Sequence, residues 1–169
     1  MILGESTKLR PLTRKDLELV RLWRNHDEIR CHMYSTGLIS SEEHLAWFDR
    51  LSAEPGRHLM IFEVANVPHG FINIGPADAS GCAAWGFYVA PGSTRGTGKI
   101  LGASTLRYAF DELGLKKVRG EVLASNQASI NFHRSLGFEQ EDRPAGGRFD
   151  NARSQDVICF GLSAESFRK

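Results

Sequence analysis

Three strand-like runs follow one another in the middle of the chain, HLMIFEVA, HGFINIG and CAAWGFYVA. They are rich in β-branched and aromatic residues, and turn-forming residues separate them, as in NVPHG and PADASG. Strands that succeed one another without a helix between them favour an antiparallel sheet. This run of strands restricts the chain to folds that are built on such a sheet.

Helical signals lie on both sides of the three strands. Capping pairs, Thr13 with Asp16 and Ser40 with Glu43, begin two helices before them. After them come a glycine loop with a helix, the strand VRGEVLA, a helix capped by Asn126, and the final strand DVICFGL. The order β-α-α-β-β-β-α-β-α-β-β predicts a single α+β domain over residues 1–169. We expect about four helices around a mostly antiparallel, twisted sheet.

The composition narrows the choice of partners. The 169 residues carry a net charge of +1, so a large basic face for nucleic acid is not required. No apolar run reaches the length of a membrane span, and the beginning, MILGESTKLRPL, shows no secretory signal. Cys31, Cys82 and Cys159 are far apart and odd in number, which favours buried thiols in a reducing compartment. We therefore expect a cytoplasmic protein that binds no metal, membrane or nucleic acid.

A glycine-rich stretch, GSTRGTGKIL at residues 92–101, leads from the third strand into a helix. A P-loop requires Ser or Thr after its lysine, but Ile100 follows Lys99, and the glycine spacing also differs from that of a dinucleotide fingerprint. Glycines still let backbone N–H groups approach an anion at a helix start. Taken alone, this stretch is either a phosphate cradle or a plain tight turn.

A second stretch favours the phosphate cradle. NQASINFHRSLGF, residues 126–138, fits the pattern N-x-x-S-x-x-x-(Y/H)-x-x-x-G-F, and WGFYVAPGSTRGTG precedes it at residues 85–98. The two stretches together resemble the GNAT superfamily of acetyl-CoA-dependent N-acetyltransferases, whose R-x-x-G-x-(G/A) loop matches RGTG. Ile100 departs from this pattern, because the family usually has Gly or Ala there. The resemblance implies the GNAT fold and acetyl-CoA as cosubstrate.

The resemblance also implies a set of cofactor contacts. Backbone N–H groups from Arg95 to Ile100 would hold the pyrophosphate of coenzyme A, and the strand Phe87–Val89 would pair with its pantetheine arm. The N–H of Val89 would polarise the thioester carbonyl, as in an oxyanion hole. Asn126 would meet the amide portion of the cofactor. The implied cofactor-binding residues are Phe87, Val89, Arg95, Gly96, Thr97, Gly98, Lys99, Ile100, Asn126 and Ser129.

The N-terminal third points to the acetyl acceptor. LVRLWRNHDEIRCHMYSTGLISSEEHLAWFDRL contains W-R-N-x-x-x-(I/V)-R, then M-Y, then I-S-x-E-E-H-L-x-W-F. These motifs are similar to those of the aminosugar N-acetyltransferases of pseudaminic acid biosynthesis. That resemblance implies the 4-amino group of a UDP-linked 4-amino-4,6-dideoxy-N-acetyl-altrosamine as acceptor, and flagellin glycosylation as the destination of the product.

Five residues are the implied acceptor contacts. Arg24 and His44 would bind the pyrophosphate of the nucleotide-sugar, since arginine and histidine donate to phosphate oxygens. Met33, Tyr34 and Trp47 would form the apolar niche that the methyl group of a deoxysugar requires.

Simpler interpretations of three of these residues stay open. Arg24 is also placed to form a surface ion pair with Asp27 or Glu28, and Trp47 to pack in the core. His44 is equally compatible with an exposed position on its helix.

Two residues are candidates for proton transfer. His133 occupies the position at which the family commonly has a tyrosine that donates a proton to the coenzyme A sulfur, so we predict that His133 is the general acid. The alternative is a packing histidine on an amphipathic helix, in which case Tyr88 is the next candidate. No carboxylate lies in CAAWGFYV, so the proton of the acceptor amine would leave through water toward His44 or a nearby acid.

Other functions compete with this hypothesis. An N-terminal alanine acetyltransferase of the ribosomal-protein type shares the LRPL start and the NxxSxxxxxxxGF motif. A binding module that senses acyl-CoA without catalysis, from a different functional class, is a further alternative. Polyamine acceptors are less favoured, since a cationic amine requires an acidic mouth and the N-terminal half is mixed in charge. Both a monomer and a homodimer are compatible with the sequence, and RPAGGRFDNARSQD is expected to form a surface hairpin.

Overall fold

The structure is a computed structural model that describes residues 4–142 and 157–169. Its contacts divide the chain into two compact units, Met1–Pro76 with Trp85–Thr105, and Ala77–Ala84 with Leu106–Lys169. The expectation of a single domain stays a prediction. The segment expected to form a surface hairpin, residues 143–156, lies outside the described residues.

Seven strands are hydrogen-bonded in the order β1-β2-β3-β4-β5-β7-β6. All neighbouring pairs are antiparallel except β4 with β5, which are parallel. The predicted α+β class with a mostly antiparallel sheet is therefore confirmed.

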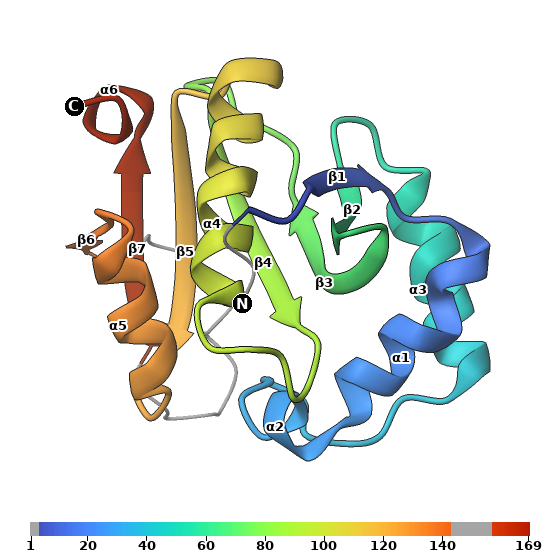
Figure 1. Cartoon of the computed structure of the whole chain (residues 1–169). Coiled ribbons are helices and arrows are strands. Elements are labelled where there is room, and N and C mark those ends of the chain that lie inside the picture. The colour runs from blue at the N-terminus through green and yellow to red at the C-terminus, as the bar shows by residue number, and fades with distance from the viewer. Residues whose placement is uncertain (1–3, 143–156) are drawn as a thin grey trace. The chain divides into compact units, whose positions relative to one another are not determined.

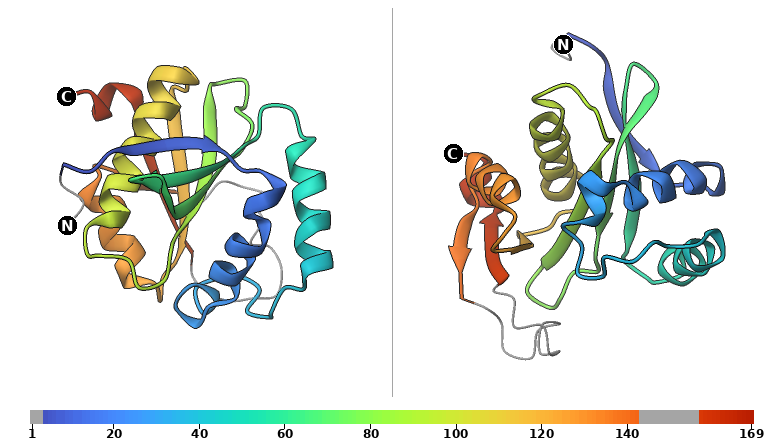
Figure 2. Two further views of the ribbon diagram at one scale, coloured as in Figure 1. Left: turned by 45° about the vertical axis from the view of Figure 1, so that its right-hand side comes forward. Right: turned by 90° about the horizontal axis from the view of Figure 1, so that it is seen from below.

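The first unit holds the N-terminal strands and the helices that pack on them (Figure 1). Its elements are β1 (Thr7–Pro11), the 3-10 turn η1 (Arg14–Asp16), α1 (Leu17–Asn25), α2 (Asp27–Arg30), α3 (Ser41–Ser52), β2 (His58–Val64), β3 (Val67–Ile74), the Trp85–Val89 part of β4 (Cys82–Val89), and most of α4 (Thr97–Arg107). Within this unit, α1 and α3 cover one face of the strands and α4 covers the other (Figure 2).

Alternation along the strands produces these two apolar faces. Leu59, Ile61 and Phe71 point toward α1 and α3, where they form one buried cluster with Val20 and Trp23. On the other face, Gly70 of β3 lets α4 approach the sheet. A Cβ atom at Gly70 would collide with the side chain of Leu101.

A buried ion-pair network fixes the beginning of α1 against the strands. Arg10 of β1 donates to both carboxylate oxygens of Asp16 at 2.8 Å and to Glu63 of β2 at 2.9 Å. Asp16 also accepts hydrogen bonds from the backbone N–H of Thr13 at 2.8 Å and from its hydroxyl at 3.0 Å. The pKa values of Asp16 and Glu63 are both held below their ordinary range, chiefly by the Arg10 guanidinium. The sequence predicted the cap that Thr13 and Asp16 form, but not the ion pair between Asp16 and Arg10 of β1.

The second unit holds the C-terminal elements. They are the π-helical turn η2 (Tyr108–Glu112), β5 (Lys117–Leu123), α5 (Gln127–Ser135), β6 (Glu139–Glu141), β7 (Val157–Ser163) and α6 (Ala164–Phe167). The Cys82–Ala84 part of β4 also belongs to this unit and pairs with β5. Cys82 and Cys159 are buried as free thiols, whereas Cys31 of the first unit is exposed, so the expectation of three buried thiols was wrong for Cys31.

Candidate active site

The glycine loop enters α4 through a left-handed residue. Gly96 has φ +97°, a conformation that L side chains rarely adopt, and no atom lies within 4 Å of the position of a Cβ there. The N–H and the hydroxyl of Thr97 donate to the carbonyl of Thr94 at 3.1 and 2.6 Å. The N–H of Ile100 donates to the Gly96 carbonyl at 3.2 Å. Two N–H groups of the predicted cradle, those of Thr97 and Ile100, are therefore used inside the helix start.

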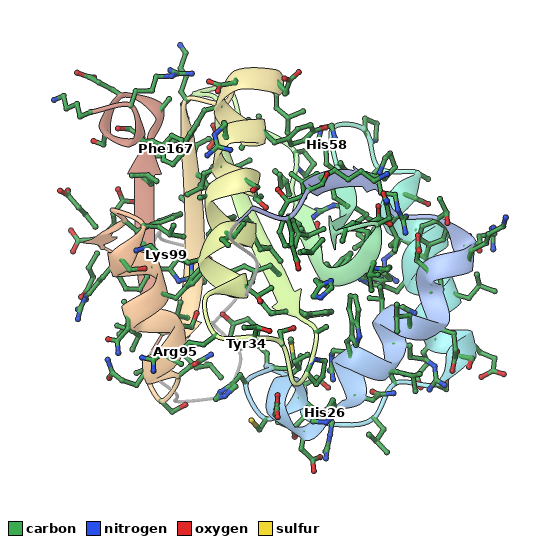
Figure 3. The ribbon with its side chains drawn as sticks, viewed as in Figure 1. His26, Tyr34, His58, Arg95, Lys99 and Phe167 are labelled. Atoms are coloured by element: carbon green, nitrogen blue, oxygen red, sulfur yellow. The ribbon has the colours of Figure 1, made fainter. Side chains whose placement is uncertain are left out.

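The remaining N–H groups of the loop are available. In the described part of the chain, no protein acceptor is recorded for the N–H groups of Arg95, Gly96, Gly98 and Lys99. Arg95 lies in the exposed loop before α4 and Lys99 in the first turn of α4 (Figure 3). Unpaired donors at a helix start attract an anion. The cradle is therefore corrected to these four groups, with two cationic side chains beside them.

Strand β4 presents the N–H of Val89 away from β3. Ala90 N–H donates to the carbonyl of His69 at 2.8 Å, which makes the facing residues Val89 and Gly70 a non-hydrogen-bonded pair. The N–H and C=O groups of such a residue point to the opposite edge of its strand. The pairing of β4 with β5 covers Cys82–Ala84 and does not extend to Val89. An extended ligand at this edge can accept from the Val89 N–H, as the predicted thioester contact requires.

Arg24 of α1 is buried, and the described part of the chain records no counter-charge for it. The residue is 5% exposed, and its Nη2 donates a hydrogen bond to the carbonyl of Ser35 at 2.7 Å. Its Nη1 is buried and has no hydrogen-bond partner among the described residues. The alternative of an ion pair with Asp27 is wrong, because Asp27 accepts from Arg30 at 2.6 Å, and none is recorded with Glu28.

His44 of α3 is buried as well, so its expected exposed alternative is wrong. Its ring stacks on Trp47 at 4.9 Å between centroids and 11° between planes, and the residue is 5% exposed. No hydrogen bond to either ring nitrogen is recorded within the described residues. Burial lowers the pKa of His44 first, and the charges of Arg21 and Arg24 lower it further. The imidazole is therefore neutral near pH 7.

The other three implied acceptor contacts lie in the same unit. Met33 and Tyr34 are half-buried in the segment between α2 and α3, which is the segment that Arg24 binds through Ser35 (Figure 3). Trp47 packs against the buried cluster of the first unit and also carries the His44 ring. Trp47 thus packs against the core, as the simpler interpretation expected. It also stacks on His44, which is a candidate acceptor contact.

Phe71 is a residue that the sequence analysis missed. Its ring lies 5.7 Å from Trp47 and 5.1 Å from Tyr88, between centroids, so it connects α3 to β4. The sequence marks Phe71 only as part of a strand. The hairpin register, in which Phe71 faces Tyr88, was the signal that could have identified it.

In the second unit, the motif N-x-x-S has a structural role. The side-chain oxygen of Asn126 accepts from the N–H of Ser129 at 3.2 Å and caps α5. Asn126 and Ser129 are both partly exposed. A role of either residue in cofactor binding is compatible with this cap and stays a prediction.

His133 lies in an aromatic cage. Its ring stacks on Phe160 at 5.2 Å and meets Phe138 and Phe132 edge-on, and the residue is 3% exposed. Its Nδ1 lies 2.8 Å from the carbonyl of Ser129, so this nitrogen carries the proton of a neutral ring. Burial lowers the pKa of His133. The predicted imidazolium acid does not fit these surroundings, and the packing alternative does; the role of His133 in proton transfer stays a prediction.

In the described residues, no group of three or more His, Cys, Asp or Glu side chains is placed to hold a metal ion. No helix of that part of the chain has both the length and the apolar character of a membrane span. A surface hollow of about 640 Å³ in the second unit lies between Gly114 and α6, and it contains no predicted site residue.

Comparisons with known proteins agree with this geometry. A sequence profile of the acetyltransferase (GNAT) domain matches residues 7–139. The acetyltransferase PseH of Campylobacter jejuni is 27% identical over 128 residues, which cover 75% of this chain and 79% of that protein. The structure of spermidine N-acetyltransferase from Vibrio cholerae, solved in complex with CoA and spermine, has a TM-score of 0.83 at 21% identity. The alignment covers 96% of this chain and 98% of the V. cholerae chain. The crystal structure of C. jejuni PseH has a TM-score of 0.69 at 20% identity, with coverages of 94% and 98%.

Proposed function

The chain belongs to the acetyltransferase (GNAT) family, and we propose that it transfers the acetyl group of acetyl-CoA to an aminosugar that is linked to a nucleotide. The acceptor we propose is the 4-amino group of a UDP-linked 4-amino-4,6-dideoxy-N-acetylaminosugar, in the biosynthesis of pseudaminic acid for flagellin glycosylation. Similarity to PseH supports this choice, together with the W-R-N, M-Y and E-E-H-L-x-W-F motifs of the N-terminal third.

The cofactor half of the proposal rests on two features of the first unit. The N–H groups of Arg95, Gly96, Gly98 and Lys99 would receive the pyrophosphate, and the N–H of Val89 would polarise the thioester carbonyl. The V. cholerae relative was solved with CoA bound. In the second unit, we assign Asn126 and Ser129 to the amide portion of the cofactor.

The unpaired charge of Arg24 is the observation that favours an anionic acceptor. Asp16 and Glu63 are the buried acids among the described residues, and Arg10 neutralises both. Within residues 4–142 and 157–169, the buried charge left without a partner is therefore a cation. Such a guanidinium favours an anionic acceptor, such as a sugar diphosphate, and repels a polyamine. Met33, Tyr34 and Trp47 would line the niche for the deoxysugar methyl group.

Two other acceptors compete. Spermidine is the acceptor named for the V. cholerae protein, but a likeness at 21% identity shows the fold alone. An N-terminal alanine peptide needs an open cleft rather than a buried cation. A module that binds acyl-CoA without turnover is the alternative outside the enzymes.

The test is the release of coenzyme A thiol from acetyl-CoA with a panel of acceptors. The panel contains the UDP-4-amino-4,6-dideoxysugar, an alanine peptide and spermidine. We expect turnover with the UDP-sugar, and we expect Arg24→Met to raise KM for it by about tenfold or more, since a lost charge-assisted contact costs about 1.5 to 3 kcal/mol. Arg14→Met is the matched control, because Arg14 pairs with Asp49 on the surface. Turnover with the peptide or spermidine alone contradicts the proposed acceptor.

A further inference from the structure

A continuous row of aromatic rings connects two titratable side chains in the first unit. The imidazole of His44 stacks on Trp47, Trp47 meets Phe71 at 5.7 Å, and Phe71 meets the phenol ring of Tyr88 at 5.1 Å. The row begins on α3, crosses β3 and ends on β4, one residue before Val89. The contacts hold both end rings in fixed orientations, as proton-transfer groups require.

Neither end of the row is committed to a protein partner. Within the described residues, no hydrogen bond is recorded for the ring nitrogens of His44 or for the hydroxyl of Tyr88. His44 is buried and Tyr88 is partly buried, yet neither is among the residues whose buried polar atoms lack a partner, so their polar atoms stay accessible. The two polar groups are therefore open to a ligand that supplies hydrogen-bond partners.

The environments of the two residues separate their protonation states. Burial lowers the pKa of His44 and raises the pKa of Tyr88. Among the described residues, the charges that act on the His44 pKa come from α1: Arg21 and Arg24 lower it, and Glu18 raises it. Arg24 also lowers the pKa of Tyr88. At neutral pH the imidazole therefore has a free lone pair and the phenol keeps its proton, which is how an enzyme separates its base from its acid.

We propose that His44 accepts a proton from the acceptor ammonium and that Tyr88 donates a proton to the departing thiolate. This inference rests on the proposed acetyl transfer. Burial keeps the imidazole neutral before the reaction, and the charge of Arg24 adds to this effect and lowers the pKa of Tyr88.

The protons and bonds balance in this sequence. An N–H bond of the acceptor ammonium breaks and its proton moves to a ring nitrogen of His44. The free amine forms a C–N bond to the thioester carbon, the C–S bond breaks, and the thiolate takes the phenolic proton of Tyr88. The phenolate then recovers a proton from the acetylated nitrogen, and His44 releases its proton to solvent.

Kinetics over a range of about pH 5.5 to 9 tests the two roles. We expect His44→Gln to lower kcat by about 10² to 10³, to remove the fall in rate on the acidic side, and to regain activity with added imidazole. Tyr88→Phe should lower kcat by about 10² with little change in KM. The controls are His69→Gln, a partly exposed histidine bonded to the Val67 carbonyl, and Tyr108→Phe of the second unit. A His44→Gln protein that changes only in KM, or a Tyr88→Phe protein with unchanged kcat, overturns the corresponding role.

A titration of His44 by NMR tests Arg24 without any acceptor. In the unliganded protein, the His44 pKa should lie below the ordinary value of about 6.5 and should rise in Arg24→Met, because the cation is gone while the burial remains. Arg24→Lys keeps the charge and should leave the His44 pKa low. Equal pKa values in the Met and Lys variants refute a contribution of the Arg24 charge to the His44 pKa. A protein that acetylates no member of the acceptor panel refutes the proposed function, and this titration still decides the effect of Arg24.

Discussion

Replacement of Arg10 by glutamine should destabilise the first unit strongly at neutral pH. The guanidinium makes three charge-assisted hydrogen bonds, two to Asp16 and one to Glu63, and both carboxylate side chains are less than a tenth exposed. Glutamine leaves two carboxylates buried, with only the Thr13 cap and the exposed Lys8, 3.3 Å from Glu63, to compensate.

The size of the effect follows from these contacts. Removing one partner of a fully buried ion pair costs about 3 to 5 kcal/mol. Because the Arg10 side chain is 29% exposed, we expect the lower end, about 3 kcal/mol of unfolding free energy. The same substitution at Arg14, whose pair with Asp49 is mostly exposed, should cost less than about 1 kcal/mol.

The loss of unfolding free energy in Arg10→Gln should become smaller as pH falls. The pKa values of Asp16 and Glu63 are lowered in the folded protein, so their stabilisation is complete above the unfolded values of about 3.9 and 4.3 and disappears as pH falls through the folded values. Urea unfolding, followed by tryptophan fluorescence, should show a wide gap between Arg10→Gln and the unsubstituted protein at pH 7 and a narrower gap near pH 3. Equal losses for Arg10→Gln and Arg14→Gln, or a gap that widens in acid, would refute the network.

Three further predictions concern single positions. His133→Phe keeps an aromatic ring in the cage, so kcat should stay within about threefold, whereas loss of a true general acid lowers it by about 10² or more; stopped assays on the folded variant distinguish the two. Ala65 and Asn66 form the β2–β3 turn with φ +51° and +66°, so replacing them by Asn and Gly should stabilise the protein by about 1 kcal/mol, seen as a Tm higher by about 2 to 4 °C. Gly96→Ala should raise the KM for acetyl-CoA by about tenfold. Gly92 also has a positive φ but lies outside the run of available N–H groups, so Gly92→Ala should lower only the stability. Equal KM values for the two variants contradict the cradle.

Local signals predicted the elements well because each depends on a short stretch of chain. Ser40 does accept from the N–H of Glu43, and Asn126 from that of Ser129, as the capping patterns predict. The three consecutive strands pair as expected, since alternation and turns fix their register.

Burial of single side chains in the site could not be predicted in the same way. His44 and Arg24 are both buried and electrostatically coupled because α1 and α3 pack against each other, and nothing in either helix alone indicates that packing. The sequence motif around His133 suggested chemistry, but the ring of Phe160 from a distant strand, the nearby Phe138 ring and a helix carbonyl give it a packing environment. The number of loop N–H groups expected to bind the pyrophosphate was too high for a similar reason. Those of Thr97 and Ile100 donate to carbonyls within the helix start.

The most direct test of the central claim is to identify the acetylated product. The protein is incubated with acetyl-CoA, the UDP-4-amino-4,6-dideoxysugar and spermidine together, and the products are analysed by mass spectrometry and NMR. The proposed function predicts one acetyl group on the 4-amino nitrogen of the sugar and unmodified spermidine. Acetylated spermidine beside an unmodified sugar would contradict it, since the unpaired cation of Arg24 would then not select the acceptor.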